Sequence, residues 1–312
     1  MWSRRISPLV LSLLLAAAGT CSCGKVEAGP DQPAPSSIPP ADGSTPDVDA
    51  VDVQSPPHSC PSGLPGPPMV EVVPTHAGTS YCIDSREVSQ GEYFTFLGVF
   101  LEAPTVSAQK KADAGEWPAA QGCEWNLSLM PGYGDEPCYS QAPSAFSQKN
   151  KYPSFAVACV NWCSAYSYCL WAGKRLCGRI GGGALSVPEV TDPAKAEWFN
   201  VCSQGGKTTF GYGDVYNPDV PTPNHLTVNG SGLWADSPDQ CRGTLSPFDK
   251  IQGIGCNVAE WQDACEVKPA ATLCSVHIVA PTGMPDEPRC EYHDEAMQQR
   301  PDPRIGFRCC HD

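Results

Sequence analysis

The sequence predicts a domain with a short strand, a few helices and long loops stapled by disulfides. Two segments combine a helix-capping residue with apolar residues at three- and four-residue spacing, which is typical of helices with one buried face. Gly, Pro, Asn and Asp dominate the stretch from Gly205 to Pro247, which indicates irregular loops. Sixteen of the 18 cysteines follow residue 23, enough to cross-link these loops.

A short strand and a capped helix come first. Residues 83–88 alternate in polarity enough to form a strand. Ser89 and Glu92 then form a capping box, in which the hydroxyl and the carboxylate each satisfy a free amide at the helix start. The helix that starts there is predicted to bury one face, which consists of Tyr93, Phe96, Leu97 and Phe100.

The next helix is predicted between a cap at Asn161 and a stop at Gly173. An aspartate-proline pair at residues 192–193, a capping acid and a first helical position, predicts a third helix that carries Trp198 and Cys202. The buried face of the helix after Asn161 is rich in aromatic residues and consists of Trp162, Ala165, Tyr166, Cys169 and Leu170.

The amino terminus has the layout of a secretory signal. Arg4 and Arg5 precede an apolar run at residues 8–18, and small residues and two cysteines follow it. The run is shorter than the roughly 20 helical residues that span a membrane. We therefore expect residues 1–22 to direct export and to be removed.

A cysteine next to small residues also resembles the lipobox of bacterial lipoproteins, in which the first mature residue is acylated. Either Cys21 or Cys23 would carry the lipid, although Thr20 stands where the motif usually has another residue. Two outcomes stay open. One is a lipoprotein of the cell envelope, outer membrane or cell surface, and the other is cleavage after Ala18 and secretion.

Residues 23–68 predict an extended, acidic and disordered tether. From residue 26 to residue 80 there is no Lys, Arg, Phe, Trp or Tyr, and 12 of the 33 prolines lie between Pro30 and Pro68. Such a segment buries too little apolar surface to offset the entropy cost of ordering, and its prolines make it stiff. The remaining residues, 69–312, are long enough for one large domain with a substantial core.

The charge of the chain argues against some partners. The net charge is −14, and residues 69–312 hold 17 basic against 28 acidic side chains, a charge of −11. We expect no binding to nucleic acid or to anionic lipid, because both favour a basic surface. We expect the protein to contact a membrane only through a lipid anchor. Separately, we expect the domain to be a monomer.

The even number of cysteines in an exported chain predicts an oxidised framework. The sequence has no C-x2-C motif and no pair of histidines at helical metal spacing, so zinc and thioredoxin-like sites are not indicated. The adjacent Cys309 and Cys310 are expected to bond to two different partners, because a bond between neighbours is strained. The disulfide candidates are Cys169, Cys177, Cys202, Cys241, Cys265, Cys309 and Cys310.

Short motifs stand in a fixed order over about residues 81–310. They are Ile83-Asp84, Glu87-Val88, Tyr93, Trp162, Ala165, Tyr168-Cys169, Trp171 to Leu176, Glu197-Trp198, Gly205-Gly206, Tyr212-Gly213, Asn257 to Trp261 and Gly306 to Cys309. Together they resemble the formylglycine-generating enzyme family, also called the sulfatase-modifying factor family. The resemblance implies a C-type-lectin-like α+β fold with a small twisted antiparallel sheet, two main helices and abundant loops, in a divergent exported bacterial member.

The chain departs from the family pattern in three places, and the first is an insertion. A glycine-rich loop from Cys177 to Pro193 precedes Glu197 and Trp198, which in the family follow the R-L motif closely. The glycines at residues 181–183 lack the following Lys and Ser or Thr of a phosphate loop, which favours a flexible loop.

The second departure concerns calcium. Family members often hold Ca²⁺ through an Asp or Asn side chain, backbone carbonyls and a glutamate, the oxygen ligands that a hard cation needs. In this chain the carbonyls of Cys256 and Val258 and the carboxylate of Glu260 match, but Gly253 replaces the Asp or Asn. The resemblance thus implies a partial calcium site. The alternative is that Glu260 pairs with a core amide or arginine, with Trp261 packed beneath.

The third departure concerns copper. Oxidases of the family resemble one another in two cysteines separated by four residues, which bind Cu(I) as a soft thiolate pair. No two cysteines of this chain have that spacing. Cys274 and Cys290 are the remaining candidates only if a hairpin brings them together, and in that case a disulfide is favoured over a copper site.

Two functions follow from these departures. The first is a non-catalytic binding or structural module for an unknown protein or glycan partner, with contacts expected among Trp234, Asp236 and the loop Tyr212–Asn224. The second is a copper-dependent oxidase that converts a cysteine of an exported sulfatase to formylglycine. The missing cysteine spacing favours the first. A redox or metal-storage protein would rest on the number of cysteines alone.

Overall fold

The computed structural model describes residues 59–75, 79–101, 122–126, 128–132, 138, 153–220, 241–277 and 287–312, without the side chains of residues 99–101. The predicted leader, both candidate lipidation cysteines and most of the predicted tether lie outside these residues. Residues 54–312 form one compact unit. None of the helices in the described ranges is long and apolar enough to cross a membrane.

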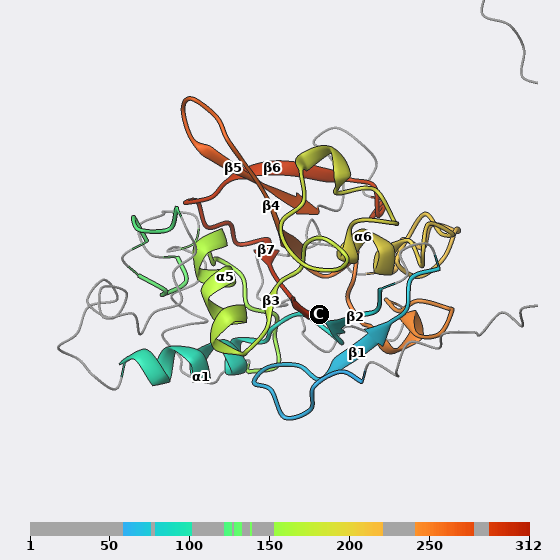
Figure 1. Cartoon of the computed structure of the whole chain (residues 1–312), viewed down its shortest axis with the longest axis horizontal. Coiled ribbons are helices and arrows are strands. Elements are labelled where there is room, and N and C mark those ends of the chain that lie inside the picture. The colour runs from blue at the N-terminus through green and yellow to red at the C-terminus, as the bar shows by residue number, and fades with distance from the viewer. Residues whose placement is uncertain are drawn as a thin grey trace, which may run out of the picture. The chain divides into compact units, whose positions relative to one another are not determined.

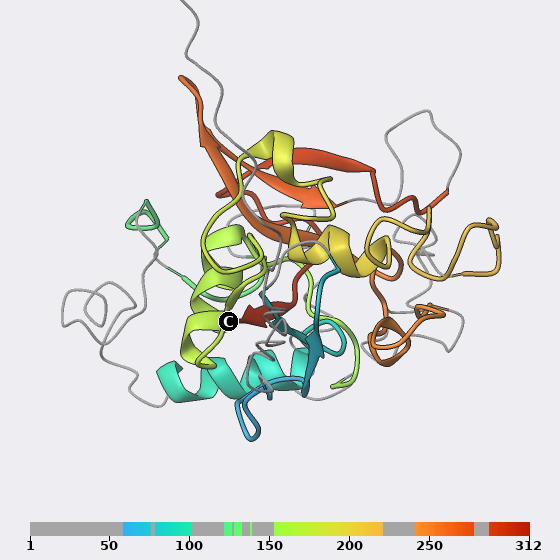
Figure 2. The same ribbon diagram turned by 45° about the vertical axis from the view of Figure 1, so that its right-hand side comes forward.

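Short helices and two small sheets, joined by long loops, make up the described part of the chain, which confirms the α+β class (Figures 1 and 2). The helices are α1 (Gln90–Leu101), α5 (Trp162–Trp171), α6 (Glu197–Cys202) and the 3-10 turns η1 (Val187–Glu189) and η3 (Phe248–Lys250). The strands are β1 (Met69–Val72), β2 (Tyr81–Asp84), β3 (Arg175–Leu176), β4 (Ala259–Val267), β5 (Thr272–His277), β6 (His293–Met297), β7 (Ile305–Gly306) and β8 (Cys309–His311).

The first sheet joins the two ends of the folded unit. Its strand order is β1-β2-β8-β3, and its neighbouring strands pair antiparallel. Cys310 of β8 pairs with Ile83 of β2 on one side and with Arg175 of β3 on the other. The closing strand of the chain therefore holds this sheet together from its interior.

The second sheet has the order β6-β5-β4-β7, whereas the resemblance implied one small sheet. Strands β4, β5 and β6 pair antiparallel, and β7 pairs parallel to β4, with Ile305 opposite Ala259. Phe307 and Arg308 alone separate β7 from β8. Because β7 belongs to the second sheet and β8 to the first, these two residues lie where the chain passes from one sheet to the other.

The start of helix α1 agrees with the predicted capping box. The Ser89 amide donates to Glu92 Oε2 at 2.9 Å, and the Glu92 amide donates to Ser89 Oγ at 3.3 Å. Strand β2 ends at Asp84, however, so residues 85–88 bend toward the helix and do not continue the strand. The buried aromatic face of α1 begins at Tyr93, in the first turn of the helix.

Helix α5 also has the predicted ends. Asn161 Oδ1 accepts a hydrogen bond from the Ser164 amide at 2.8 Å, which caps the first turn. Gly173 follows the helix with a φ of +71°, a conformation that suits glycine.

Helix α6 starts later than the sequence predicted. Asp192 caps only a turn, in which its carboxylate accepts from the Ala194 amide at 2.9 Å. Ala196 is extended (φ −96°, ψ 119°) because it pairs with Arg179 in an antiparallel bridge to the glycine-rich loop. The helix therefore begins at Glu197, and the predicted start at residues 192–193 was wrong.

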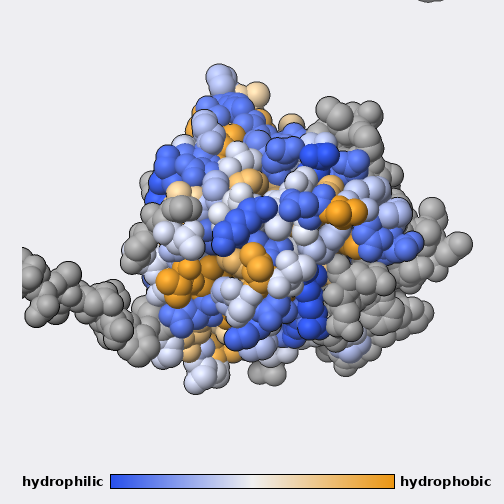
Figure 3. Space-filling model, turned by 90° about the vertical axis from the view of Figure 1, so that its right-hand side faces the viewer, coloured by the Kyte–Doolittle hydropathy of each residue, from blue (hydrophilic) through white to orange (hydrophobic). Residues whose placement is uncertain are grey.

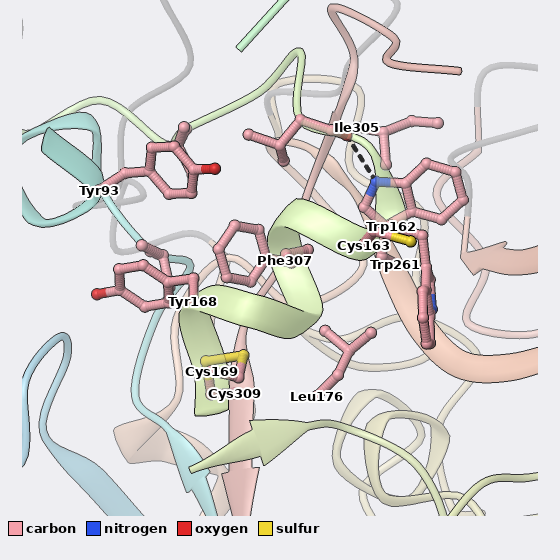
Figure 4. Packing of buried hydrophobic residues seen from close by; sticks show 14 of the residues in the cluster. Tyr93, Trp162, Cys163, Tyr168, Cys169, Leu176, Trp261, Ile305, Phe307 and Cys309 are labelled. Carbon is pink, nitrogen blue, oxygen red and sulfur yellow. Dashed lines mark hydrogen bonds between the residues drawn. A yellow bond between two sulfur atoms is a disulfide. The ribbon is translucent and has the colours of Figure 1, made fainter. Parts of the chain in front are cut away.

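Aromatic rings fill the core beside α1 and α5 (Figure 4). Tyr93 of α1, Tyr168 of α5 and Phe307 are buried, and their ring centroids lie 5.4–6.2 Å apart. Phe96 adds contacts at 5.3 Å to Tyr93 and 5.4 Å to Tyr168. The predicted buried face of α1 is present as far as it is described, and Phe100 lies outside the described side chains.

All sixteen cysteines from Cys60 onward are paired in eight disulfides. The adjacent Cys309 and Cys310 bond to two different partners, and Figure 4 shows the first of these bonds between α5 and β8. Cys60 lies within the predicted tether, yet its bond to β2 ties it to the folded unit. The bonds are Cys60–Cys82, Cys123–Cys163, Cys138–Cys159, Cys169–Cys309, Cys177–Cys310, Cys202–Cys290, Cys241–Cys256 and Cys265–Cys274.

Candidate functional site

Four charged residues of the sequence motifs meet in a buried cluster. Asp84 ends β2, Glu87 lies in the bend before α1, Glu260 lies on β4, and Arg308 links β7 to β8. The side chains of all four are completely buried. They meet because β2 belongs to the first sheet, β4 belongs to the second, and Arg308 lies on the segment that connects the two sheets.

Arg308 is at the centre of this cluster. Its Nε and Nη2 atoms donate to the two carboxylate oxygens of Glu260 at 2.8 and 2.7 Å, which makes a bidentate pair. Further donations reach backbone carbonyls, from Nη1 to Asp84 at 3.3 Å and from Nη2 to Gln252 at 3.0 Å. Burial alone would lower the pKa of Arg308, but the charge and hydrogen bonds of Glu260 raise it, so the guanidinium stays charged.

The residues of the expected calcium site do not fit a metal ion in this arrangement. Both Glu260 oxygens accept hydrogen bonds from Arg308, and Trp198 Nε1 donates to one of them at 3.0 Å. The space for a side chain at position 253 is filled, because a Cβ atom on Gly253 would overlap the carboxylate of Glu87. The guanidinium supplies the positive charge in place of a metal ion, and the alternative pairing of Glu260 with an arginine is the one found.

The two carbonyl donors expected for calcium are both buried close to Glu260. Cys256 forms a disulfide with Cys241, and Val258 lies one residue before β4. Between them, Asn257 has a φ of +56° and directs its side-chain amide toward Glu87. This turn therefore positions a hydrogen-bond donor for Glu87 of the buried charge cluster.

Glu87 is the least satisfied member of the cluster. Its Oε1 atom accepts from Asn257 Nδ2 at 3.1 Å, whereas Oε2 has no hydrogen-bond partner among the described residues and lies 3.8 Å from Arg308 Nη2. Burial, supported by the charge of Glu260, raises the pKa of Glu87 to about 8, although Arg308 and Asn257 lower it. Glu87 is therefore expected to hold a proton at neutral pH.

Replacing Glu87 with glutamine is expected to change how stability depends on pH. Folded Glu87 keeps its proton up to about pH 8, whereas the unfolded side chain loses it near its ordinary pKa of 4.5. This group therefore stabilises the fold below that value, and about 4 kcal/mol of its contribution is lost as the pH rises to about 8. The glutamine variant mimics the protonated acid and lacks this loss. Urea unfolding across the same pH range measures the difference.

Glu92→Gln is the matched control for this experiment. Although burial raises the pKa of Glu92, hydrogen bonds from Arg86 and Ser89 hold it below its usual value, so the charge is present throughout this pH range. Its effect on stability is expected to be the same at both ends of the range. An equally constant effect of Glu87→Gln would contradict a buried, protonated Glu87.

A second buried ion pair fixes the closing strand. Lys174 Nζ donates to Asp84 Oδ1 at 2.5 Å and to the Pro67 carbonyl at 2.9 Å, and neither charged side chain is exposed. The Cys309 amide donates to the other Asp84 oxygen at 2.9 Å. Burial raises the pKa of Asp84 to about 6, although Lys174 lowers it. The lysine of the Gly-Lys-Arg-Leu motif thus holds β2 and β8 in place.

The cysteines do not fit a copper site. The register of β4 and β5 places Cys274 opposite Cys265, and these two residues form a disulfide. Cys290 bonds to Cys202 of α6. Cys274 and Cys290, which could have met across a hairpin, do not bond to each other, because the β4–β5 hairpin pairs Cys274 with Cys265. Neither sulfur remains as a thiolate that could bind Cu(I).

One other cluster has the composition of a metal site. Cys177, Glu197 and Cys310 place ligand atoms within 4.8 Å of one another, and no other such group occurs in the described ranges. The two sulfurs are bonded to each other, and Glu197 accepts from Arg175 at 2.7 and 2.5 Å and from the Gly178 amide at 2.9 Å. These partners make the cluster a structural cross-link.

A pocket lies on the loop that the sequence indicated for binding. Trp234, Asp236 and residues 221–224, which belong to the same prediction, lie outside the described residues. The second wall of the pocket was missed, because its position depends on the disulfide partner of Cys241, which the sequence does not specify. The pocket has a volume of about 670 Å³ and is lined by Tyr212, Val215, Tyr216, Asn217, Arg242, Gly243, Thr244 and Asp249.

These features define a disulfide-stapled α+β domain whose motif residues form buried ion pairs. A family model described as "Sulfatase-modifying factor enzyme 1-like domain" matches residues 71–312, and the chain belongs to this family. Two solved structures similar to this chain are titled "Crystal Structure of CarF" and "Structure of PvdO from Pseudomonas aeruginosa". The first is 15% identical, covering 80% of this chain and 96% of that chain with a TM-score of 0.41. The second is 14% identical, covering 80% and 90% with a TM-score of 0.41. No curated protein matches the chain.

Proposed function

We propose that this chain is an exported envelope protein whose sulfatase-modifying factor domain is a non-catalytic binding module. The observation that carries the proposal is the pairing of all sixteen cysteines from Cys60 onward. The oxidase activity found in this family would require two thiolates that hold Cu(I). Here each candidate sulfur is already part of a disulfide.

Other features support export and anchoring. Eight disulfides are typical of an oxidising compartment outside the cytosol. The leader with Arg4 and Arg5 has the layout of a secretory signal, and Cys21 or Cys23 would carry a lipid. The proline-rich segment before Cys60 would then hold the domain away from the membrane surface.

The alternative is an active oxidase, and a direct assay separates the two. The purified protein is incubated with Cu(I), oxygen and a peptide that carries the Cys-x-Pro-x-Arg motif, and the mass of the peptide is followed. We expect no change of mass at the cysteine. An active oxidase of the family, assayed in parallel, shows that the peptide and the copper are competent.

Thiol titration of the denatured protein provides the second measurement. Without reductant, no thiol from Cys60 onward is expected to react, and after reduction all sixteen are expected to react. Formation of formylglycine in the peptide, or two reactive thiols in the unreduced domain, would overturn the proposal.

A further inference from the structure

The pocket on the Tyr212 loop is a depression that is largely open to solvent. Its volume is about 670 Å³. One wall consists of Tyr212, Val215, Tyr216 and Asn217, and the other consists of Arg242, Gly243, Thr244 and Asp249. Both loops lie on the right-hand side of Figures 1 and 2.

The first wall is aromatic. Phe210 is buried and stacks on Tyr212, with ring centroids 5.4 Å apart and an interplanar angle of 6°. Tyr216 lies against the same Phe210 ring at 6.0 Å and is 36% exposed, and Val215 beside it is 81% exposed. The guanidinium of Arg289 lies 5.7 Å from the centre of the Phe210 ring. The loop therefore presents a tyrosine ring and an aliphatic side chain, supported by a fixed aromatic layer.

Both walls are held in place by contacts outside the pocket. Cys241, directly before the second wall, forms a disulfide and packs with Val220 against Tyr212. Gln204 Oε1 fixes the second wall by accepting from the Thr244 amide at 3.0 Å. A ligand that binds between such walls loses little affinity to the ordering of loops.

Polar groups surround the aromatic wall. Asn217 and Thr244 are polar, while Arg242 and Asp249 carry one positive and one negative charge. The charges of the lining therefore balance, whereas residues 69–312 as a whole have a charge of −11. The domain repels polyanions, and the balanced lining favours a neutral ligand.

Figure 3 shows the side of the molecule that lies at the right of Figure 1. Most of its described surface is hydrophilic, and the hydrophobic residues form small, separate patches. A protein partner that buries a broad apolar area finds no such area among the described residues of this face. A small polar ligand suits this surface better.

We propose that the pocket binds a neutral oligosaccharide, an inference that rests on the proposed function as a binding module and specifies its ligand. A sugar ring combines an apolar C–H face with neutral hydroxyls at its edge, as the pocket combines an aromatic wall with a balanced polar rim. The C–H face packs on the Tyr216 ring. The hydroxyls donate to the Asp249 carboxylate and accept from the Asn217 amide.

The test is a glycan array followed by calorimetry on the purified full chain. The array carries neutral malto-, cello-, manno- and chito-oligosaccharides together with sulfated and uronic acid oligosaccharides. We expect binding to at least one neutral series and none to the acidic series. Tyr216→Ala is expected to weaken that binding by about tenfold, the effect of losing one aromatic contact of about 1.4 kcal/mol. Asp249→Ala is expected to weaken it as well.

Val267→Ala is the matched control, because Val267 is 84% exposed on β4 and does not line the pocket. It is expected to leave affinity unchanged. Absence of binding to every neutral series, binding of the acidic series alone, or unchanged affinity in Tyr216→Ala would each overturn the inference. Those results would leave the copper assay and the thiol titration unaffected, so failure of the ligand assignment is distinguishable from failure of the proposed function.

Discussion

Replacing Arg308 with methionine is expected to lower the free energy of unfolding by about 3–5 kcal/mol. The substitution removes the bidentate pair and leaves the Glu260 carboxylate buried, with the Trp198 indole as its remaining donor among the described residues. The carbonyls of Asp84 and Gln252 also lose a donor. Urea unfolding of the variant and the wild-type protein at neutral pH gives the difference.

Arg304→Met is the matched control at the surface. Arg304 pairs with Asp302 at 2.9 Å, but its side chain is 55% exposed, and such pairs contribute about 0–1 kcal/mol. The double variant Arg308→Met/Glu260→Gln is expected to recover part of the loss, because it removes the uncompensated buried charge. A loss in Arg308→Met no larger than the loss in Arg304→Met would show that the cluster does not hold the two sheets together.

Removing both disulfides of the closing strand is expected to cost more than the sum of removing each alone. The bonds Cys169–Cys309 and Cys177–Cys310 join residues 140 and 133 positions apart, and the two loops overlap, because residues 177–309 belong to both. While either bond is intact, the other closes a ring of about ten residues, which contributes about 2.5–3 kcal/mol. When both are removed, a loop of about 45 residues opens, because the bond from α6 to Cys290 shortens it, and about 4 kcal/mol more is lost.

Three alanine variants measure this effect, one for each bond and one for both. Urea unfolding without reductant is expected to give losses of about 2.5–3 kcal/mol for each single removal and about 6.5–7 kcal/mol for the double removal. If the double variant is unfolded in buffer, a stabilising concentration of sucrose makes all three measurable under one condition. Thiol titration verifies that the other disulfides have formed.

The matched control removes the bond Cys265–Cys274, which joins residues nine positions apart in the β4–β5 hairpin. Its removal is expected to cost about 2.5 kcal/mol and to add to either single removal, because it shares no loop with the closing strand. If the double variant lost only the sum of the two single losses in the free energy of unfolding, the bonds at Cys309 and Cys310 would not act on one shared loop.

The sequence correctly predicted the start of α1 and both ends of α5, which depend on contacts within one helical turn. The caps at Ser89 and Asn161 involve hydrogen bonds to atoms three residues away, so the local order of residues is enough to predict them. Gly173 likewise ends α5 because of its own backbone conformation.

The spacing of apolar residues also predicted the buried residues Tyr93, Phe96 and Leu97 of α1. On α5 it was partly wrong, because Tyr166 and Leu170 are only half-buried and Tyr168 is buried instead.

Elements that depend on distant partners were missed or misplaced. Asp192 has the composition of a helix start, but Ala196 pairs with Arg179 in the inserted loop, and this pairing delays α6 to Glu197. The second sheet needs β7 to lie parallel to β4, a contact that no local pattern indicates. The partner of Cys274 stayed open, because strand register, which the sequence does not specify, decides which cysteines meet.

The candidate site also has features that the sequence predicted and features that it did not. The motif resemblance indicated that Glu87, Glu260 and Arg308 matter, and the loss of a side chain at Gly253 indicated a weakened calcium site. The sequence did not show that the Glu87 carboxylate fills the space beside Gly253, a contact between residues more than 160 positions apart. The aromatic loop at Tyr212 was indicated as a binding surface, but not its opposite wall.

By itself the sequence determined the family, the α+β class, the helix caps and the absence of the cysteine spacing that the oxidases share, because each of these is a local pattern or a count. The tertiary structure decided which sulfurs bond and which charge Glu260 meets. These outcomes depend on where β7 and β8 join the two sheets. Arg308 reaches Glu260 because the chain changes sheets at that residue, and removing either partner would leave an uncompensated buried charge.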